Sequence, residues 1–300
     1  GVLKNREMIA VKRIVSSWMP GSQEQFQNEV YHLMMLKHPN IVRFLGYCYE
    51  TRNEVKLCNG KRVFAEVAER LLCLEYLPKG SLDKYLSGTT FNMNALLLVP
   101  IADESSGLDW STRYNIIEGI CYGLCHLHEQ IDKKIIHLDL KPPNILLDDR
   151  MVPKITDFGL SRLLDQQQTL YTESRHGTFG YMPPEIFHGG TVTPKSDIFS
   201  LGVIIMEVIT GRRDYPDVTR ESPDEYIELA LTKWRVVLHR STCDESLETY
   251  CKQIKRCIQV GLMCVHPDRT KRPPIMQVID MLQGLKVIDC NIIDNATQQY

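Results

Sequence analysis

The residues whose types and spacing best suit chemistry lie within residues 136–148, where the sequence reads I-H-L-D-L-K-P-P-N-I-L-L-D. Apolar residues flank a short polar cluster, so both ends of this segment should be fixed in a core while the cluster occupies an exposed turn. In that turn, Asp139, Lys141 and Asn144 bring a carboxylate, an ammonium group and a neutral oxygen ligand into one loop. Phosphoryl transfer needs such a set, because it uses a proton acceptor, a cation for the phosphate and a metal ligand.

A second acidic motif follows thirteen residues after Asn144, where Asp157-Phe158-Gly159 joins a carboxylate to an apolar residue and a flexible one. A polar turn between two buried strands would explain either motif alone, but the order and spacing of the pair argue against that interpretation. Together the two motifs resemble the catalytic loop and the magnesium-binding motif of eukaryotic protein kinases.

This resemblance implies a role for each polar residue of the two motifs. Asp139 would orient and deprotonate a substrate hydroxyl, and Lys141 would neutralise the γ-phosphate of ATP in the transition state. Asn144 and Asp157 would hold Mg²⁺. A lysine follows the aspartate by two residues, as in serine/threonine kinases. The implied acceptor is therefore a serine or threonine hydroxyl of a protein substrate.

A single lysine, Lys12, lies in a β-rich run over residues 8–15. Alone it would be a solvated strand residue, but the run resembles the V-A-I-K strand of kinases, whose lysine holds the α- and β-phosphates. Glu29 lies in a helix that capping and apolar spacing predict over residues 22–37, and spacing alone favours a surface glutamate. Residues 26–48, however, resemble plant receptor-like kinases of the interleukin-1-receptor-associated and Pelle type. In these the glutamate pairs with the strand lysine, so we predict a Lys12–Glu29 ion pair.

The adenine side of the implied nucleotide site falls on a buried strand over residues 71–74 and on the residues after it. By resemblance, Leu74 guards the back of the adenine pocket, whereas Glu75 and Leu77 offer backbone groups to the base. Proline and glycine follow in the sequence and mark a boundary between two lobes.

The resemblance implies an α+β, two-lobed kinase fold with the nucleotide between the lobes. Residues 1–77 would form a small antiparallel sheet with one helix, residues 78–287 a mainly helical lobe, and residues 288–300 a flexible tail. We expect the sequence to begin after the first strand and the glycine-rich loop, whose backbone covers the nucleotide phosphates in the family. Residues 87–106 are expected to be an insertion. It is either a partner-binding loop or a gene-model or splicing remnant without an evolved role, and we favour the remnant.

Further residues match positions with structural or regulatory roles in the family. Glu185 and Arg272 would form a buried ion pair beneath the substrate platform, although each alone looks like a surface charge. Asp197 would brace the backbone of the catalytic loop. A stacked apolar column would consist of Leu33, Phe44, His137 and Phe158. The complete structural and regulatory set is His137, Phe158, Gly159, Thr178, Glu185, Asp197 and Arg272.

Leu138 distinguishes this chain from kinases that are switched by phosphorylation of the activation segment, here residues 157–185. Those kinases carry an arginine just before the catalytic aspartate, and its guanidinium binds the loop phosphate. Leucine has neither a charge nor a donor, so the chain resembles the non-arginine class of receptor-like kinases, which is often linked to immune perception. We predict that activity does not depend on a phosphate–arginine contact at residue 138.

Composition excludes several other classes of protein. Three hundred residues, 43% apolar and 24% charged, suit one large soluble domain or two lobes. The formal net charge of −2 gives no electrostatic argument for nucleic acid or an anionic membrane. The ten cysteines form no C-x-x-C pair, and we expect them to be reduced and mostly buried in a cytoplasmic protein. No apolar run is long enough to span a membrane, so any anchor would belong to a longer parent protein, and a monomer is expected.

Three functions stay open from the sequence. The first is an active serine/threonine kinase domain in receptor-like signalling, with plant defence as one setting. The second is a catalytically impaired kinase-fold scaffold, which the missing glycine-rich loop would favour. The third is a non-enzymatic interaction module, which is disfavoured because a binding protein has no need of a complete phosphoryl-transfer set.

Overall fold

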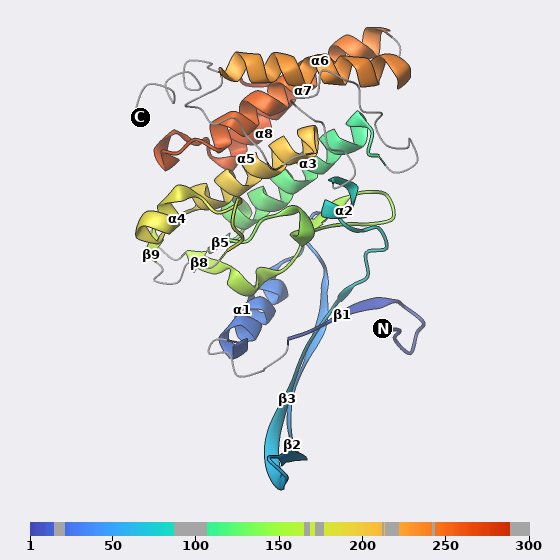
Figure 1. Ribbon diagram of the computed structural model, residues 1–300, viewed down its shortest axis with the longest axis vertical. Helices are drawn as coiled ribbons and strands as arrows, with labels where there is room; N and C mark the ends of the chain where they lie inside the picture. The colour runs from blue at the N-terminus through green and yellow to red at the C-terminus, as the bar shows by residue number, and fades with distance from the viewer. Residues whose placement is uncertain are drawn as a thin grey trace.

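The computed structural model describes residues 1–14, 22–86, 107–164, 169–171, 177–211, 213, 222–241 and 244–288. A small part built on a sheet and one helix joins a larger, mainly helical part (Figure 1). The α+β architecture expected from the sequence is therefore confirmed. The predicted insertion over residues 87–106 and nearly all of the predicted tail lie outside the described residues.

The small part contains an antiparallel sheet in the order β1-β3-β2, formed by Ile9–Arg13, Lys61–Glu75 and Phe44–Cys58. Helix α1, Ser22–Met35, packs beside the sheet and ends two residues before the predicted end at Lys37. Phe26 and Leu33 are buried because the apolar residues of α1 recur at helical spacing and share one face.

Strands β2 and β3 form a hairpin that the amino-acid sequence indicates only by its turn: residues 48–69 are charged and show little apolar pattern, whereas Asn59-Gly60 predicts a hairpin turn. Residues 48–69 form most of this hairpin, and its turn is Asn59–Gly60. Both turn residues have positive φ, 50° and 74°, as a two-residue hairpin turn of this type requires. The predicted turn is confirmed. The strands were missed because the hairpin projects away from the rest of the molecule (Figure 1), so its outer half has no buried face to impose alternation.

The larger part is built around α5, Pro194–Thr210, whose residues are buried on all sides from Leu201 to Met206. The sequence of residues 201–210 is apolar nearly all round, which is typical of a fully buried helix. Helix α3, Trp110–Cys125, continues into a π-helical turn, η1, at His126–Gln130. The remaining helices are α2 Asp83–Leu86, α4 Pro184–Gly189, α6 Pro223–Ser241, α7 Asp244–Cys264 and α8 Ile275–Gln283.

Short strands and single 3₁₀ turns position the two sequence motifs. Strands β4 Gly80–Ser81, β6 Ile145–Leu147 and β7 Pro153–Ile155 form one sheet; β5 Lys134–Ile136 pairs with β8 Arg162–Leu164, and β9 Leu170–Tyr171 pairs with β10 Thr191–Val192. The 3₁₀ turns are η2 Pro142–Asn144, η3 Phe158–Leu160 and η4 Arg269–Lys271. The segment 137–144 is thus held by β5 before it and by β6 after it.

A short segment of the small part is fastened to the large part by its backbone. The amide of Ile155 donates to Asn40 O at 2.9 Å, and the amide of Val42 donates to Ile155 O at 3.0 Å. Helix α3 approaches closely here, since a Cβ on Gly119 would lie 2.5 Å from the Pro153 ring. Glycine at position 119 is therefore needed for this packing.

The cysteine prediction is partly wrong. All cysteines among the described residues are free thiols, as expected for a reduced protein, but only half of them are buried. The buried ones are Cys121, Cys125, Cys257 and Cys264. In the part of the chain that the structure describes, no helix is long and apolar enough to cross a membrane.

Candidate active site

Asp197, in the first turn of α5, fixes the backbone of the loop that carries Asp139. Its two carboxylate oxygens accept hydrogen bonds from the amides of His137 at 2.8 Å and Leu138 at 2.9 Å. A third bond, 2.9 Å long, joins the same carboxylate to Nε2 of buried His128. Leu138 has φ +65°, and the carboxylate satisfies both amides at this left-handed bend. The predicted brace is present.

The polar cluster of the loop closes around the Asp139 carboxylate. Nδ2 of Asn144 donates to Asp139 Oδ2 at 3.0 Å and to the Asp139 carbonyl at 2.9 Å. Nζ of Lys141 lies 2.8 Å from the same Oδ2. The Thr178 hydroxyl donates to Asp139 Oδ1 at 2.7 Å and accepts from Lys141 at 2.7 Å. These contacts hold the carboxylate and the ammonium group side by side in fixed orientations.

Lys12 joins the small part to the second motif. Its ammonium group lies 2.9 Å from both oxygens of Glu29 and 2.8 Å from Oδ1 of Asp157. The predicted Lys12–Glu29 pair is present, and Glu29 is fully buried. Burial opposes the charge on Lys12, but the two carboxylates outweigh burial and raise its pKa. Burial likewise opposes the charge on Asp157, yet Lys12 lowers the pKa of this carboxyl overall, so it stays ionised.

The backbone of the second motif is strained into a shape that aims Asp157 towards Lys12. Asp157 has φ +68° and ψ +72°, in the left-handed region that only a few residue types adopt readily. Phe158 is fully buried, and its ring meets the His137 ring edge to face at 5.0 Å. Gly159 follows where α1 comes close, because a Cβ there would lie 2.6 Å from Nε2 of Gln25.

The residues predicted on the adenine side lie at the end of β3 and just after it. Leu74 and Leu77 are buried in the main core. The Glu75 amide donates to Arg43 O at 3.0 Å, and its carboxylate accepts from the Arg43 amide at 2.7 Å and pairs with Lys154 at 3.1 Å. The end of β3 is thus bonded both to Arg43, just before β2, and to Lys154 on β7.

The residues that could hold a metal ion are Asn144 and Asp157. Because Nδ2 of Asn144 is directed at Asp139, the amide oxygen of Asn144 is the atom left for a metal. Among the described residues, no group of three or more His, Cys, Asp or Glu side chains gathers as a metal site. A metal here would complete its coordination with phosphate oxygens and water, as Mg²⁺ does in nucleotide sites.

The protein kinase domain family matches residues 2–282. The chain belongs to the protein kinase family. Members of this family use ATP and a divalent metal to phosphorylate proteins. The chain is 37% identical to cysteine-rich receptor-like protein kinase 26 of Arabidopsis thaliana, over 95% of this chain and 39% of the relative. It is 39% identical to the G-type lectin S-receptor-like serine/threonine-protein kinase SD1-13 of the same plant, over 92% of this chain and 30% of the relative.

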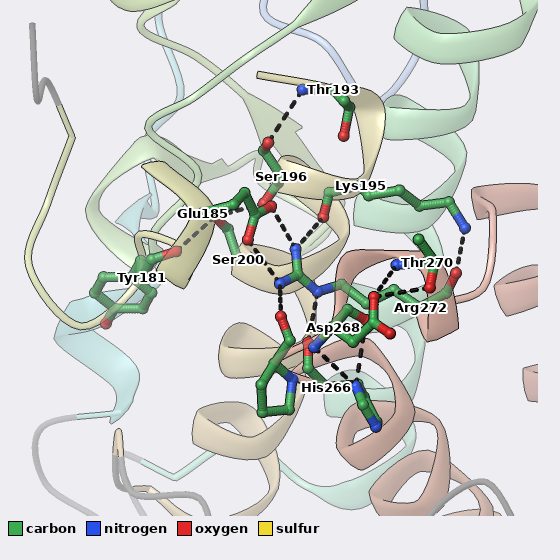
Figure 2. A network of polar contacts seen from close by, with 11 residues as sticks. Tyr181, Glu185, Thr193, Lys195, Ser196, Ser200, His266, Asp268, Thr270 and Arg272 are labelled. Atoms are coloured by element: carbon green, nitrogen blue, oxygen red, sulfur yellow. Dashed lines mark hydrogen bonds and ion pairs between the residues drawn. The ribbon is translucent and has the colours of Figure 1, made fainter. Parts of the chain in front are cut away.

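A buried polar network of the kinase surrounds the predicted Glu185–Arg272 pair. The guanidinium makes two parallel bonds to the Glu185 carboxylate, 2.7 and 2.8 Å long (Figure 2). It also donates to the carbonyls of His266, Pro267 and Lys195. Arg272 is only 1% exposed, so these bonds replace its water shell completely. The pair ties α4 to the segment before α8.

A buried hydrogen bond of the kinase was missed by sequence reasoning. Ser161, just after η3, lies with its Oγ 2.6 Å from His32 Nδ1 on α1 and 2.6 Å from the Phe158 carbonyl. Since the carbonyl only accepts, the hydroxyl donates to it, and His32 donates from Nδ1 as a neutral imidazole. The only signal in the sequence was that His32, a polar residue, follows Glu29 by three positions and so lies on the same face of the predicted helix.

Acid is expected to destabilise the kinase through His32. Burial lowers its pKa from 6.5 to about 4. The unfolded chain therefore binds more protons between these values, and stability falls as pH is lowered through that window. Lowering pH from 7 to 5 should cost about 2 kcal/mol at this site. Denaturant unfolding at the two pH values measures it. His32→Asn, whose amide can replace Nδ1–H, should lose about that much of the pH dependence, whereas exposed His239→Asn should retain it. If the free energy of unfolding changed equally with pH in all three proteins, the pH dependence could not be assigned to His32.

Proposed function

We propose that this chain is the catalytic domain of a receptor-like serine/threonine kinase that transfers the γ-phosphate of ATP to protein hydroxyls. The chain spans about 30–41% of the length of the curated relatives it matches. Those relatives are named receptor-like kinases, and the G-type lectin ones serine/threonine kinases. By analogy, the domain acts as a monomer on the cytoplasmic side of a parent protein, with one lobe boundary near Leu77.

One observation carries this proposal: Lys12 bridges Glu29 and Asp157 at 2.8–2.9 Å. Residues from a strand, a helix and a distant loop meet there, although 145 positions separate Lys12 from Asp157. A structural ion pair would be satisfied by one carboxylate. Two carboxylates around one partly exposed lysine leave negative charge available for a metal, and the lysine available for phosphate.

The roles in catalysis follow from the positions of the polar atoms. Asp139 would accept the proton of the substrate hydroxyl, and its neighbours keep the carboxylate in one orientation. Lys141 would hold the γ-phosphate, and Lys12 the α- and β-phosphates. Asn144 and Asp157 would hold Mg²⁺, which supplies charge neutralisation to the phosphates when it is bound.

The adenine base would lie against the buried strand end of β3. Leu74 would close the back of its pocket, while the backbone at Glu75 and Leu77 would bind the base edge. Glu29 would act through Lys12, holding its ammonium group in place for the nucleotide. Because the backbone would recognise the base, the side chains of Leu74 and Leu77 can pack in the core, and the burial of both is consistent with this.

Purified chain incubated with Mg·ATP and three peptides that differ only in a Ser, Thr or Tyr acceptor tests the proposal. We expect phosphate on the Ser and Thr peptides but not on the Tyr peptide. Asp139→Asn, which preserves the size of the side chain but removes the base, should abolish transfer while nucleotide binding remains. Nucleotide binding without turnover in the unsubstituted chain would favour the impaired scaffold, and no nucleotide binding would refute both.

Regulation at residue 138 should differ from that of arginine-bearing kinases. Leu138 packs against an apolar cluster whose buried members are Ile136, Leu164, Met182, Ile186 and Val192. An apolar contact thus takes the place of a phosphate-binding cation. We expect phosphatase-treated and fully autophosphorylated protein to have similar kcat values. A large gain on phosphorylation that is lost in Leu138→Ala would contradict this expectation.

A further inference from the structure

The outer end of the β2–β3 hairpin, here called the hairpin tip and comprising residues 55–64, is not part of the proposed catalytic site. It stands clear of both lobes (Figure 1). Strand β1 pairs with β3 only at Leu71–Glu75, so the rest of that strand edge is unpaired among the described strands. Phe64 lies eight residues from Leu72, the partner of Lys12 in β1, which is about 26 Å at the rise of a strand.

The hairpin tip exposes large apolar side chains that belong to none of the hydrophobic cores. Phe64 is 83% exposed and Leu57 74% exposed, and Val55 is also exposed. The register pairs Val55 with Phe64 and Leu57 with Arg62. Since opposed residues share a face and faces alternate along a strand, these four side chains lie on one face of the ribbon. Val63 is exposed on the other face.

The charge of the hairpin tip differs in sign from that of the whole chain. Residues 55–64 contain three basic residues and no acidic one, whereas the chain has a formal charge of −2. Lys61 and Arg62 are exposed beside the turn. The nearby acid on β2, Glu54, forms an ion pair with Arg52 at 3.0 Å, so it does not neutralise the hairpin tip.

From this combination we propose that the hairpin tip docks on an anionic phospholipid bilayer. Exposed Phe and Leu side chains can enter the interface between headgroups and acyl chains, while neighbouring Lys and Arg side chains pair with lipid phosphates and carboxylates. A second copy of the chain is a poorer occupant, because two tips of the same charge repel. A groove on another protein would cover only one face of the hairpin tip. Because apolar side chains lie on both faces, such a groove is also a poorer occupant than a bilayer.

Sedimentation of the full chain with vesicles tests this docking. We expect binding to vesicles of phosphatidylcholine mixed with phosphatidylserine, weakened by salt, and little binding to phosphatidylcholine alone. Lys61→Gln with Arg62→Gln should weaken binding roughly 25-fold, about fivefold for each charge. Leu57→Ser with Phe64→Ser should weaken it at least about tenfold. All variants should keep their thermal unfolding transition and their activity on a soluble peptide.

Matched controls use exposed residues of the same kinds far along the chain. Leu285→Ser with Val287→Ser removes apolar side chains that are 75% and 90% exposed, and should leave vesicle binding unchanged. Lys255→Gln with Lys286→Gln removes two exposed charges and should do the same. The proposal is overturned if the tip variants bind as well as the unsubstituted chain, or if the chain does not bind anionic vesicles. It is also overturned if the tip variants abolish self-association in sedimentation velocity rather than vesicle binding.

Discussion

Asp157→Asn is expected to lower kcat for phosphoryl transfer by roughly three orders of magnitude while the chain stays folded. The substitution replaces the charged carboxylate of one of the two proposed metal ligands by a neutral amide and removes one of the two carboxylates on Lys12. Its backbone cost is small, because Asn tolerates the left-handed conformation that Asp157 adopts, φ +68° and ψ +72°. Single-turnover transfer from labelled ATP, with thermal unfolding measured in parallel, separates the chemical effect from any folding effect.

Two further variants sharpen this test. Asp157→Ala should lose as much activity but should also lose about 1 kcal/mol of stability, since alanine resists positive φ. Asp149→Asn changes an exposed aspartate eight positions away and should alter neither quantity. If Asp157→Asn retained its kcat, the assignment of Asp157 as a metal ligand would be wrong.

Arg272→Met is expected to destabilise the fold by about 3–5 kcal/mol, the cost typical of breaking a buried ion pair. The pair with Glu185 loses two bonds of 2.7 and 2.8 Å, and the remaining carboxylate is left largely buried without a cation. Three backbone carbonyls, those of Lys195, His266 and Pro267, lose their donor at the same time. Denaturant unfolding monitored by tryptophan fluorescence gives the free-energy difference.

The double variant Glu185→Met with Arg272→Met provides the internal control. It removes both charges, so it should be less destabilised than the sum of the two single variants. The exposed pair Glu248–Lys252, 2.7 Å apart on α7, is the matched surface control. Lys252→Met should have no measurable effect, because solvent screens such pairs. Additive effects of Glu185→Met and Arg272→Met would refute a coupled buried pair.

Local spacing predicted the parts of the site that are close in sequence. Asp139, Lys141 and Asn144 share one loop, and their chemistry could be inferred from residue types alone. Glu29 shows the limit of that reasoning, because helical spacing favours a surface glutamate and only the family resemblance predicted its partner. Asp197 and Arg272 are similar cases: each is a single charge in its own segment, and burial arises from tertiary contacts that no local pattern records.

The hairpin and the His32–Ser161 bond were beyond sequence reasoning for opposite reasons. The outer half of the hairpin has no buried face, so its residues are not constrained to alternate and gave no strand signal beyond the Asn59–Gly60 turn. His32 is buried, but its partner lies 129 positions away, and a lone histidine in a helix does not identify a partner.

The main-chain bonds between Ile155 and Asn40–Val42 limit how the proposed nucleotide site between the two parts can open. Because these bonds join main-chain atoms, residues 40–42 should move together with the large part, to which Ile155 and Asp157 belong. Opening would then be a rotation of the small part about residues 40–42, which carries Lys12 and Glu29 together. The Lys12–Asp157 ion pair spans the two parts, so its separation should be the earliest signature of an open, inactive state.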